Sequence, residues 1–147
     1  GLSKSPAVIM VTAFGREEAM HSATDRGAAL KSVLRQDPDK VLMGEVAGQL
    51  ADKIVVTAED PRTESLDAIN VQIAEGLQRV GRRQGEDYFV VNDRAEAIAF
   101  AIKIARAGDV VIVCGKGHER SMCFGMTEYP WSDQDAVVAA LQVKSEK

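Results

Sequence analysis

Two short segments of the chain bring together side chains that suit the binding of a small polar molecule. The first, EDPRTE, spans residues 59–64 and contains Asp60, Pro61 and Arg62. The second, GKGHE, spans residues 115–119. Together they offer a guanidinium, several carboxylates, an ammonium, an imidazole and two glycines. This set of groups suits an amino acid or another zwitterion.

Each group has a definite chemical use in such a site. The Arg62 guanidinium can bind a carboxylate through two parallel hydrogen bonds, which a lysine cannot reproduce. Asp60 and Glu119 can hold an ammonium. Gly115 and Gly117 allow the backbone to come close to a ligand, and their amides can bind a second carboxylate.

Simpler explanations stay open for both segments. GKGH after a buried strand can be only a tight turn into a helix, and Arg62 can be a solvated surface residue. The spacing is not that of a Walker phosphate loop, which has four residues between its first glycine and Gly-Lys. No partner that would orient His118 as a base can be named, and Cys114 is better explained by packing. His21 and His118 are far apart, so no zinc-ligand spacing occurs.

Four apolar blocks indicate the strands that must position these segments. The blocks are rich in β-branched or aromatic residues and do not alternate with polar ones. This pattern is typical of parallel strands that helices cover on both faces. The blocks are Val8–Thr12, Lys53–Thr57, Tyr88–Asn92 and Val110–Cys114.

Helical periodicity occupies the stretches between and after the blocks. One stripe recurs at steps of three and four residues. It consists of Leu66, Ile69, Ile73, Leu77 and Val80. A second helix is expected over residues 97–105, after a capping box formed by Asp93 and Glu96. Ser132 and Asp135 indicate the start of a last helix in the same way.

This alternation predicts a single α/β domain over residues 1–147. Its sheet is expected to be doubly wound, mostly parallel and Rossmann-like, with helices on both faces. We also expect a short helix over residues 28–34, a solvated loop over residues 81–87 and an antiparallel edge element over residues 122–131. Ligands bind such sheets beyond the carboxyl ends of the strands, where both polar segments begin. The two segments should therefore lie side by side.

The composition is that of an ordinary globular protein and argues against several partners. Of 147 residues, 46% are hydrophobic and 27% are charged. The net charge of -4 argues against nucleic acid or an anionic membrane as the main partner. No apolar run has the length of a membrane span. The amino-terminal residues lack the features of a signal peptide, and two cysteines indicate reduced thiols. We expect a cytoplasmic protein.

The polar segments and their surroundings resemble the C-terminal domain of Mur ligases of the UDP-N-acetylmuramoyl-tripeptide synthetase type. KIVVTAEDPRTESLDAI is similar to the strand and DNPR loop of that family. NDRAEAIAFAIKIARAGDVVIVCGKGHE is similar to its next helix, strand and GKGHE loop. LMGEVAGQLAD resembles the helix ahead of the DNPR strand. The resemblance runs with little interruption from Leu42 to Leu141.

The resemblance implies the amino-acid-binding domain of a longer, three-domain ligase. In that family a central domain uses ATP to activate UDP-N-acetylmuramoyl-dipeptide as an acyl phosphate, and the amine of a diamino acid attacks it. By motif, Arg62 would bind the distal carboxylate of meso-diaminopimelate. Gly115 and Glu119 would bind its distal carboxyl and ammonium ends, and Asp60 would line the pocket. The loops would be supported by Pro61, Lys116, Gly117 and His118.

Further details of the resemblance bear on the substrate. Members that add lysine usually lack the arginine, so Arg62 favours diaminopimelate. The family loop usually reads Asp-Asn-Pro-Arg, whereas Glu59 and Asp60 precede the proline here. Lysine and ornithine therefore stay open as alternatives. A stretched counterpart of another family segment makes Arg26 a candidate second substrate arginine.

No Walker motif and no good counterpart of the family's DYAHTPD motif occurs in the chain. We therefore expect other domains to bind ATP, magnesium and the UDP-muramoyl-peptide. This chain should contain no catalytic residue, cofactor or metal, and should be inactive in isolation. Two alternatives stay open, namely a non-catalytic binding module and the C-terminal domain of a folylpolyglutamate or cyanophycin-type ligase. A general nucleotide-binding Rossmann domain is disfavoured because no GxGxxG follows the first strand.

Overall fold

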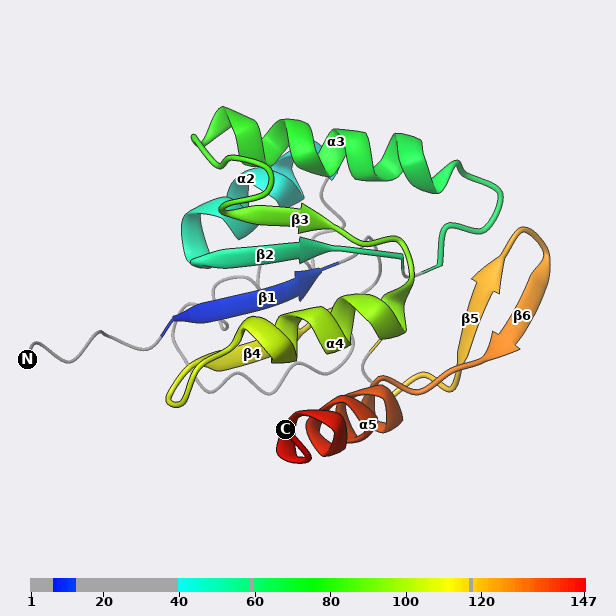
Figure 1. Ribbon diagram of the computed structural model, residues 1–147. Coiled ribbons are helices and arrows are strands. Elements are labelled where there is room, and N and C mark those ends of the chain that lie inside the picture. Colours follow the sequence, from blue (N-terminus) through cyan, green and yellow to red (C-terminus); the bar gives the residue numbers. More distant parts are fainter. Residues whose placement is uncertain (1–6, 13–39, 59, 117) are drawn as a thin grey trace, which may run out of the picture.

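The central feature of the fold is a four-stranded parallel sheet (Figure 1). The computed structural model describes residues 7–12, 40–58, 60–116 and 118–147. The strands run in the order β3-β2-β1-β4, and each neighbouring pair is parallel. Their bounds are β1 Val8–Thr12, β2 Lys53–Val56, β3 Tyr88–Val90 and β4 Val110–Val113. The expected α/β class and all four strands are confirmed.

Helices cover both faces of this sheet, as expected for a doubly wound fold. Alternate residues of β2 point to opposite faces, so Ile54 and Val56 lie in one apolar core and Val55 in the other. The first core is completed by two helices, α2 (Lys40–Leu50) and α3 (Leu66–Arg79). The second is completed by α4 (Arg94–Ile104) and α5 (Asp133–Ser145).

The helices begin where the sequence indicates. The Asp93 side chain accepts a hydrogen bond from the Glu96 amide over 2.9 Å, which starts α4. The Ser132 hydroxyl accepts from the Asp135 amide over 3.2 Å, which starts α5. Each bond satisfies one of the amides that a helix leaves unpaired in its first turn. The expected stripe of α3 is confirmed as well, since its three central residues are buried, namely Ile69, Ile73 and Leu77.

Two glycines allow α2 and α3 to pack with their backbones in contact. A Cβ atom added to Gly76 would lie 1.9 Å from the Val41 carbonyl oxygen, and one on Gly44 would lie 2.0 Å from the Ile73 carbonyl oxygen. No side chain fits in either place. This close approach fixes α3, and therefore the carboxyl end of the loop that leads from β2 into it.

Residues 121–130 form an antiparallel hairpin of β5 (Ser121–Phe124) and β6 (Thr127–Pro130). The expected antiparallel element therefore exists, but its expected place at an edge of the main sheet is wrong. The hairpin is a separate two-stranded sheet that projects beyond the carboxyl ends of the parallel strands (Figure 1). The reason is that β5 bonds to the backbone of Arg62 instead of running back along β4.

Other segments expected from the sequence are only partly covered by the described residues. Residues 81–87 form turns and loop, as expected. The expected helix over residues 28–34 lies outside the described residues, as do Arg26, Glu59 and Gly117. Within the part of the chain that the structure describes, no helix is long and apolar enough to cross a membrane.

Candidate functional site

The two polar segments meet at the carboxyl edge of the sheet, as the sequence predicts. The Lys116 ammonium donates a hydrogen bond to Asp60 Oδ2 over 2.7 Å. The other oxygen of the same carboxylate, Asp60 Oδ1, accepts from the Cys123 amide over 2.7 Å. Asp60 therefore joins the first loop to the second loop and to the hairpin. Each Asp60 oxygen thus already accepts a hydrogen bond from the protein. We therefore expect Asp60 to act in the site mainly by holding the Lys116 ammonium in place.

Lys116 is the centre of a buried charge cluster. Only 3% of the residue is exposed, and its Nζ lies 2.7 Å from Asp60 Oδ2 and 2.9 Å from Glu119 Oε2. Burial lowers the pKa of Lys116, but the two carboxylates outweigh burial, and the pKa is raised above its ordinary value. The side chain is therefore a fixed cation that holds both loops.

Glu119 is the carboxylate of this cluster with capacity left for a ligand. Its amide donates to the Lys116 carbonyl over 3.0 Å, which closes a tight turn. Its Oε2 is buried 2.9 Å from the Lys116 ammonium and, among the described residues, has no hydrogen bond of good geometry. The Glu119 side chain as a whole is 33% exposed. An ammonium group of a bound amino acid can therefore approach the exposed part of this side chain.

The backbone of Arg62 is held by the β5–β6 hairpin. Its amide donates to the Cys123 carbonyl over 3.3 Å, and its carbonyl accepts from the Gly125 amide over 2.7 Å. Its φ of 52° lies in the left-handed region, which is uncommon for a residue with a side chain. Strained backbone of this kind is concentrated at functional sites. The side chain is exposed, and within the described residues no hydrogen bond or ion pair of its guanidinium is found.

The other predicted loop residues have simpler placements. Pro61 is buried, and its carbonyl accepts from the Glu64 amide over 2.9 Å. Gly115 has a φ of 112°, a conformation that residues with side chains rarely adopt. The backbone at this point is thus free of a Cβ that would obstruct a ligand. His118 is exposed.

Arg94 is a buried residue at the carboxyl edge of the sheet, and the sequence analysis did not predict it as part of the site. It is 1% exposed and forms a bidentate pair with Asp133, with both nitrogen–oxygen distances at 2.7 Å. A signal for it exists in the sequence. Arg94 precedes Ala97 and Ile98 by three and four residues, so it falls on the apolar stripe of α4. A charged residue on a buried stripe indicates a buried ion pair.

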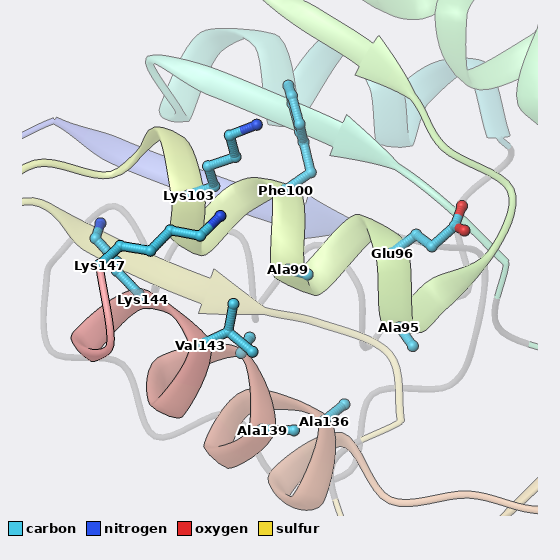
Figure 2. Close-up of a pocket in the computed structure, with 11 residues that line it drawn as sticks. Ala95, Glu96, Ala99, Phe100, Lys103, Ala136, Ala139, Val143, Lys144 and Lys147 are labelled. Carbon is cyan, nitrogen blue, oxygen red and sulfur yellow. The ribbon is translucent and has the colours of Figure 1, made fainter.

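A separate hollow of the described surface lies away from these loops. A space of about 740 Å³ opens between α4 and α5 and is lined mainly by apolar side chains, among them Ala99, Phe100 and Val143 (Figure 2). It contains none of the predicted site residues, and its charged groups are three lysines of the α4 and α5 ends and a single carboxylate, Glu96. The charged loops therefore remain the candidate site. Among the described residues, no group of three or more His, Cys, Asp or Glu side chains could hold a metal ion.

Comparisons with known proteins show the family to which the chain belongs. Residues 18–117 match the family model described as Mur ligase, glutamate ligase domain. A UDP-N-acetylmuramyl-tripeptide synthetase from a Roseiflexus species is 46% identical over 99 residues, which are 67% of this chain and 19% of that protein. A UDP-N-acetylmuramoyl-L-alanyl-D-glutamate--2,6-diaminopimelate ligase from Geobacter metallireducens is 35% identical over 117 residues, which are 72% and 23% of the two chains.

A solved structure also has this fold. It is named as the structure of a UDP-N-acetylmuramoyl-L-alanyl-D-glutamate--2,6-diaminopimelate ligase, and it superposes with a TM-score of 0.67 at 26% identity. The superposition covers 96% of this chain and 25% of that one. This chain thus spans about a fifth to a quarter of the length of the relatives that it matches.

Proposed function

Because the chain belongs to the Mur ligase family, we propose that it is the amino-acid-binding domain of an ATP-dependent ligase. The ligase would add a diamino acid to UDP-N-acetylmuramoyl-dipeptide during the synthesis of peptidoglycan precursors. We propose meso-diaminopimelate as that amino acid, with lysine and ornithine as alternatives. Some relatives are named as diaminopimelate ligases and others only as tripeptide synthetases, so their names support the reaction more firmly than the amino acid.

The observation that supports this proposal is that the Arg62 backbone bonds to Cys123, whose amide in turn bonds to Asp60 of the charge cluster. The Arg62 backbone is fixed by the hairpin, while its guanidinium is exposed. A guanidinium in this position can bind the distal carboxylate of a diamino acid through two parallel bonds. Glu119 would accept from the neighbouring ammonium, and the bare backbone at Gly115 would let the carboxylate approach an amide.

In the reaction this chain would bind and orient the amino acid, so that its other amine can attack the activated carboxyl group. Holding a nucleophile in the right geometry contributes strongly to the rate of such a step. ATP with magnesium would phosphorylate the carboxyl group to an acyl phosphate and release ADP, and attack by the amine would then release inorganic phosphate. The chain has no Walker motif that would bind the phosphates of ATP. We therefore assign those ligands and the UDP-muramoyl-peptide to other domains.

The proposal is tested by the release of ADP from the ligase that contains this chain. With UDP-N-acetylmuramoyl-dipeptide and ATP present, ADP release should depend on a diamino acid, and diaminopimelate should give the highest kcat/KM. The isolated chain should release none. Absence of any amino-acid-dependent turnover in the ligase would support the alternative of a non-catalytic module. Turnover with glutamate or folate substrates would support the folylpolyglutamate or cyanophycin alternative, which the names of the relatives do not favour.

A further inference from the structure

We propose that Arg94, paired with Asp133, is the positioning residue of the amino-acid site, because its guanidinium sets the spacing between the two ligand-binding loops. The spacing of the loops follows from the contacts of Arg94 alone, whereas the expected change in KM for the diamino acid rests on the proposed function. Arg94 lies at the amino end of α4, outside both loops.

The Arg94 guanidinium bonds to the backbone just ahead of each loop. Nη1 donates to the Ala58 carbonyl over 3.2 Å, and Nη2 donates to the Cys114 carbonyl over 2.9 Å. Ala58 precedes Asp60 by two residues, and Cys114 directly precedes Gly115. A single rigid, planar group thus fixes the carboxyl ends of β2 and β4, where the two loops begin.

Asp133, the ion-pair partner of Arg94, connects the guanidinium to the base of the hairpin as well. Asp133 Oδ1 accepts from the Trp131 indole nitrogen over 2.7 Å. The Trp131 amide in turn donates to the carbonyl of Arg120 over 2.9 Å, and Arg120 directly follows Glu119. Both ends of the GKGHE loop are therefore connected to the same ion pair.

Packing alone is a poor explanation for this ion pair. Burying two charges is costly, and apolar residues of similar volume are often equally or more stabilising in the same place. An apolar pair, however, could not donate to the two carbonyls and hold them at a fixed separation. The arrangement of Arg94 is therefore best explained by the precision that it gives to the loops, where a displacement of about 1 Å can cost about 100-fold in rate.

Arg82 provides a matched control at the opposite edge of the sheet. It also donates to two backbone carbonyls, those of Gly48 over 2.7 Å and Ala51 over 3.0 Å. It also lies near an aspartate, with 3.9 Å between its Nη1 and Asp87 Oδ1. Its contacts hold the junction of α2 and β2 at the amino end of the strand. Arg82→Lys therefore removes similar bonds to backbone carbonyls, from a more exposed position, without touching the loops.

The kinetic test compares Arg94→Lys with Arg82→Lys in the ligase that contains this chain. A lysine cannot make the four bonds of Arg94 at once, so the loops should lose their fixed spacing. We expect Arg94→Lys to raise KM for the diamino acid by about 10- to 100-fold while KM for ATP stays within about twofold. Arg82→Lys should change neither. Equal changes in the two variants, or an unchanged KM in Arg94→Lys, would overturn the inference.

A second test needs no substrate. The Cys123 amide bonds to Asp60 Oδ1, so its hydrogen exchange reports the contact between the first loop and the hairpin. In Arg94→Lys this amide should exchange roughly tenfold faster, while the α2–β2 junction keeps its protection. Arg82→Lys should show the reverse. Unchanged exchange at Cys123 would refute the positioning role, even in a ligase that accepts no diamino acid. Failure of turnover with altered exchange would refute only the proposed function.

If Arg94→Lys does not fold, Asp133→Glu replaces it in both tests. The longer carboxylate keeps the charge but shifts the pair, so the same rise in KM and in exchange is expected. A folded Asp133→Glu variant with the KM and the exchange of the wild type would overturn the inference.

Discussion

The ammonium of Lys116 and the carboxylate of Asp60 form an ion pair of 2.7 Å between residues that are 56 positions apart. This pair joins the two loops at the carboxyl edge of the sheet. Glu119 lies on the other side of the same ammonium, at 2.9 Å. The candidate site is therefore organised around a buried protein cation, which is in contact with both Asp60 and Glu119.

The first prediction concerns removal of this cation. Lys116→Met keeps most of the volume but leaves two carboxylates facing each other without a counter-ion. We expect the free energy of unfolding to fall by about 3 kcal/mol, near the lower end for a broken buried pair because both carboxylates are partly exposed. Urea unfolding followed by circular dichroism measures this. Lys103→Met, an exposed lysine of α4, is the control and should change the value by less than about 0.5 kcal/mol.

The second prediction concerns pH. The pKa of Lys116 is raised in the folded protein from its ordinary value of 10.5. A raised pKa means that the stabilisation is fully present below pH 10.5 and is lost as the pH rises through the folded value. The difference in unfolding free energy between the wild type and Lys116→Met should therefore be constant from pH 7 to about 9.5 and decrease above about 10.5. A difference that grows in alkali would contradict the assigned charge state.

The third prediction concerns the contact of α2 with α3. In Gly76→Ala the new Cβ would meet backbone atoms, 1.9 Å from the Val41 carbonyl oxygen and 2.8 Å from the Glu45 nitrogen. The helices must separate, and we expect a loss of about 2–3 kcal/mol in unfolding free energy. The control is Gly48→Ala, whose Cβ would lie 2.5 Å from a side-chain atom, Cγ2 of Val80, which can move. It should change stability by less than about 1 kcal/mol, since improved helix propensity offsets the crowding. Equal losses would show that the close backbone contact is not decisive.

Much of the fold follows from the sequence because local signals and burial agree. The non-alternating apolar blocks indicated every strand of the parallel sheet, and Asp93 and Ser132 indicated where α4 and α5 begin. The hairpin was expected at a sheet edge, where strands of its length commonly pair. The hairpin pairs instead with the backbone of Arg62. No sequence pattern indicates the left-handed conformation of that residue.

The sequence predicted residues for the candidate site but not how they pair with one another. The motif segments identified Asp60, Arg62 and Glu119, and parallel topology placed them at one edge. The sequence could not show that the Lys116 ammonium would lie between the carboxylates of Asp60 and Glu119, because that depends on side-chain packing between distant segments. Arg94 was overlooked because it stands inside a capping sequence, where a charged residue is ordinarily solvated.

The central claim is that Arg62 binds the distal carboxylate of the amino acid, and kinetics of Arg62→Ala in the ligase that contains this chain test it most directly. Charge-assisted bidentate bonds of this kind are worth on the order of 2–4 kcal/mol. Arg62→Ala should therefore lower kcat/KM for meso-diaminopimelate by about 30- to 1000-fold. Lysine, which lacks the distal carboxylate, should be affected by less than about threefold. Arg83→Ala, an exposed arginine of the 81–87 loop, should change neither value. An equal fall for both amino acids, or no fall for diaminopimelate, would contradict the assignment.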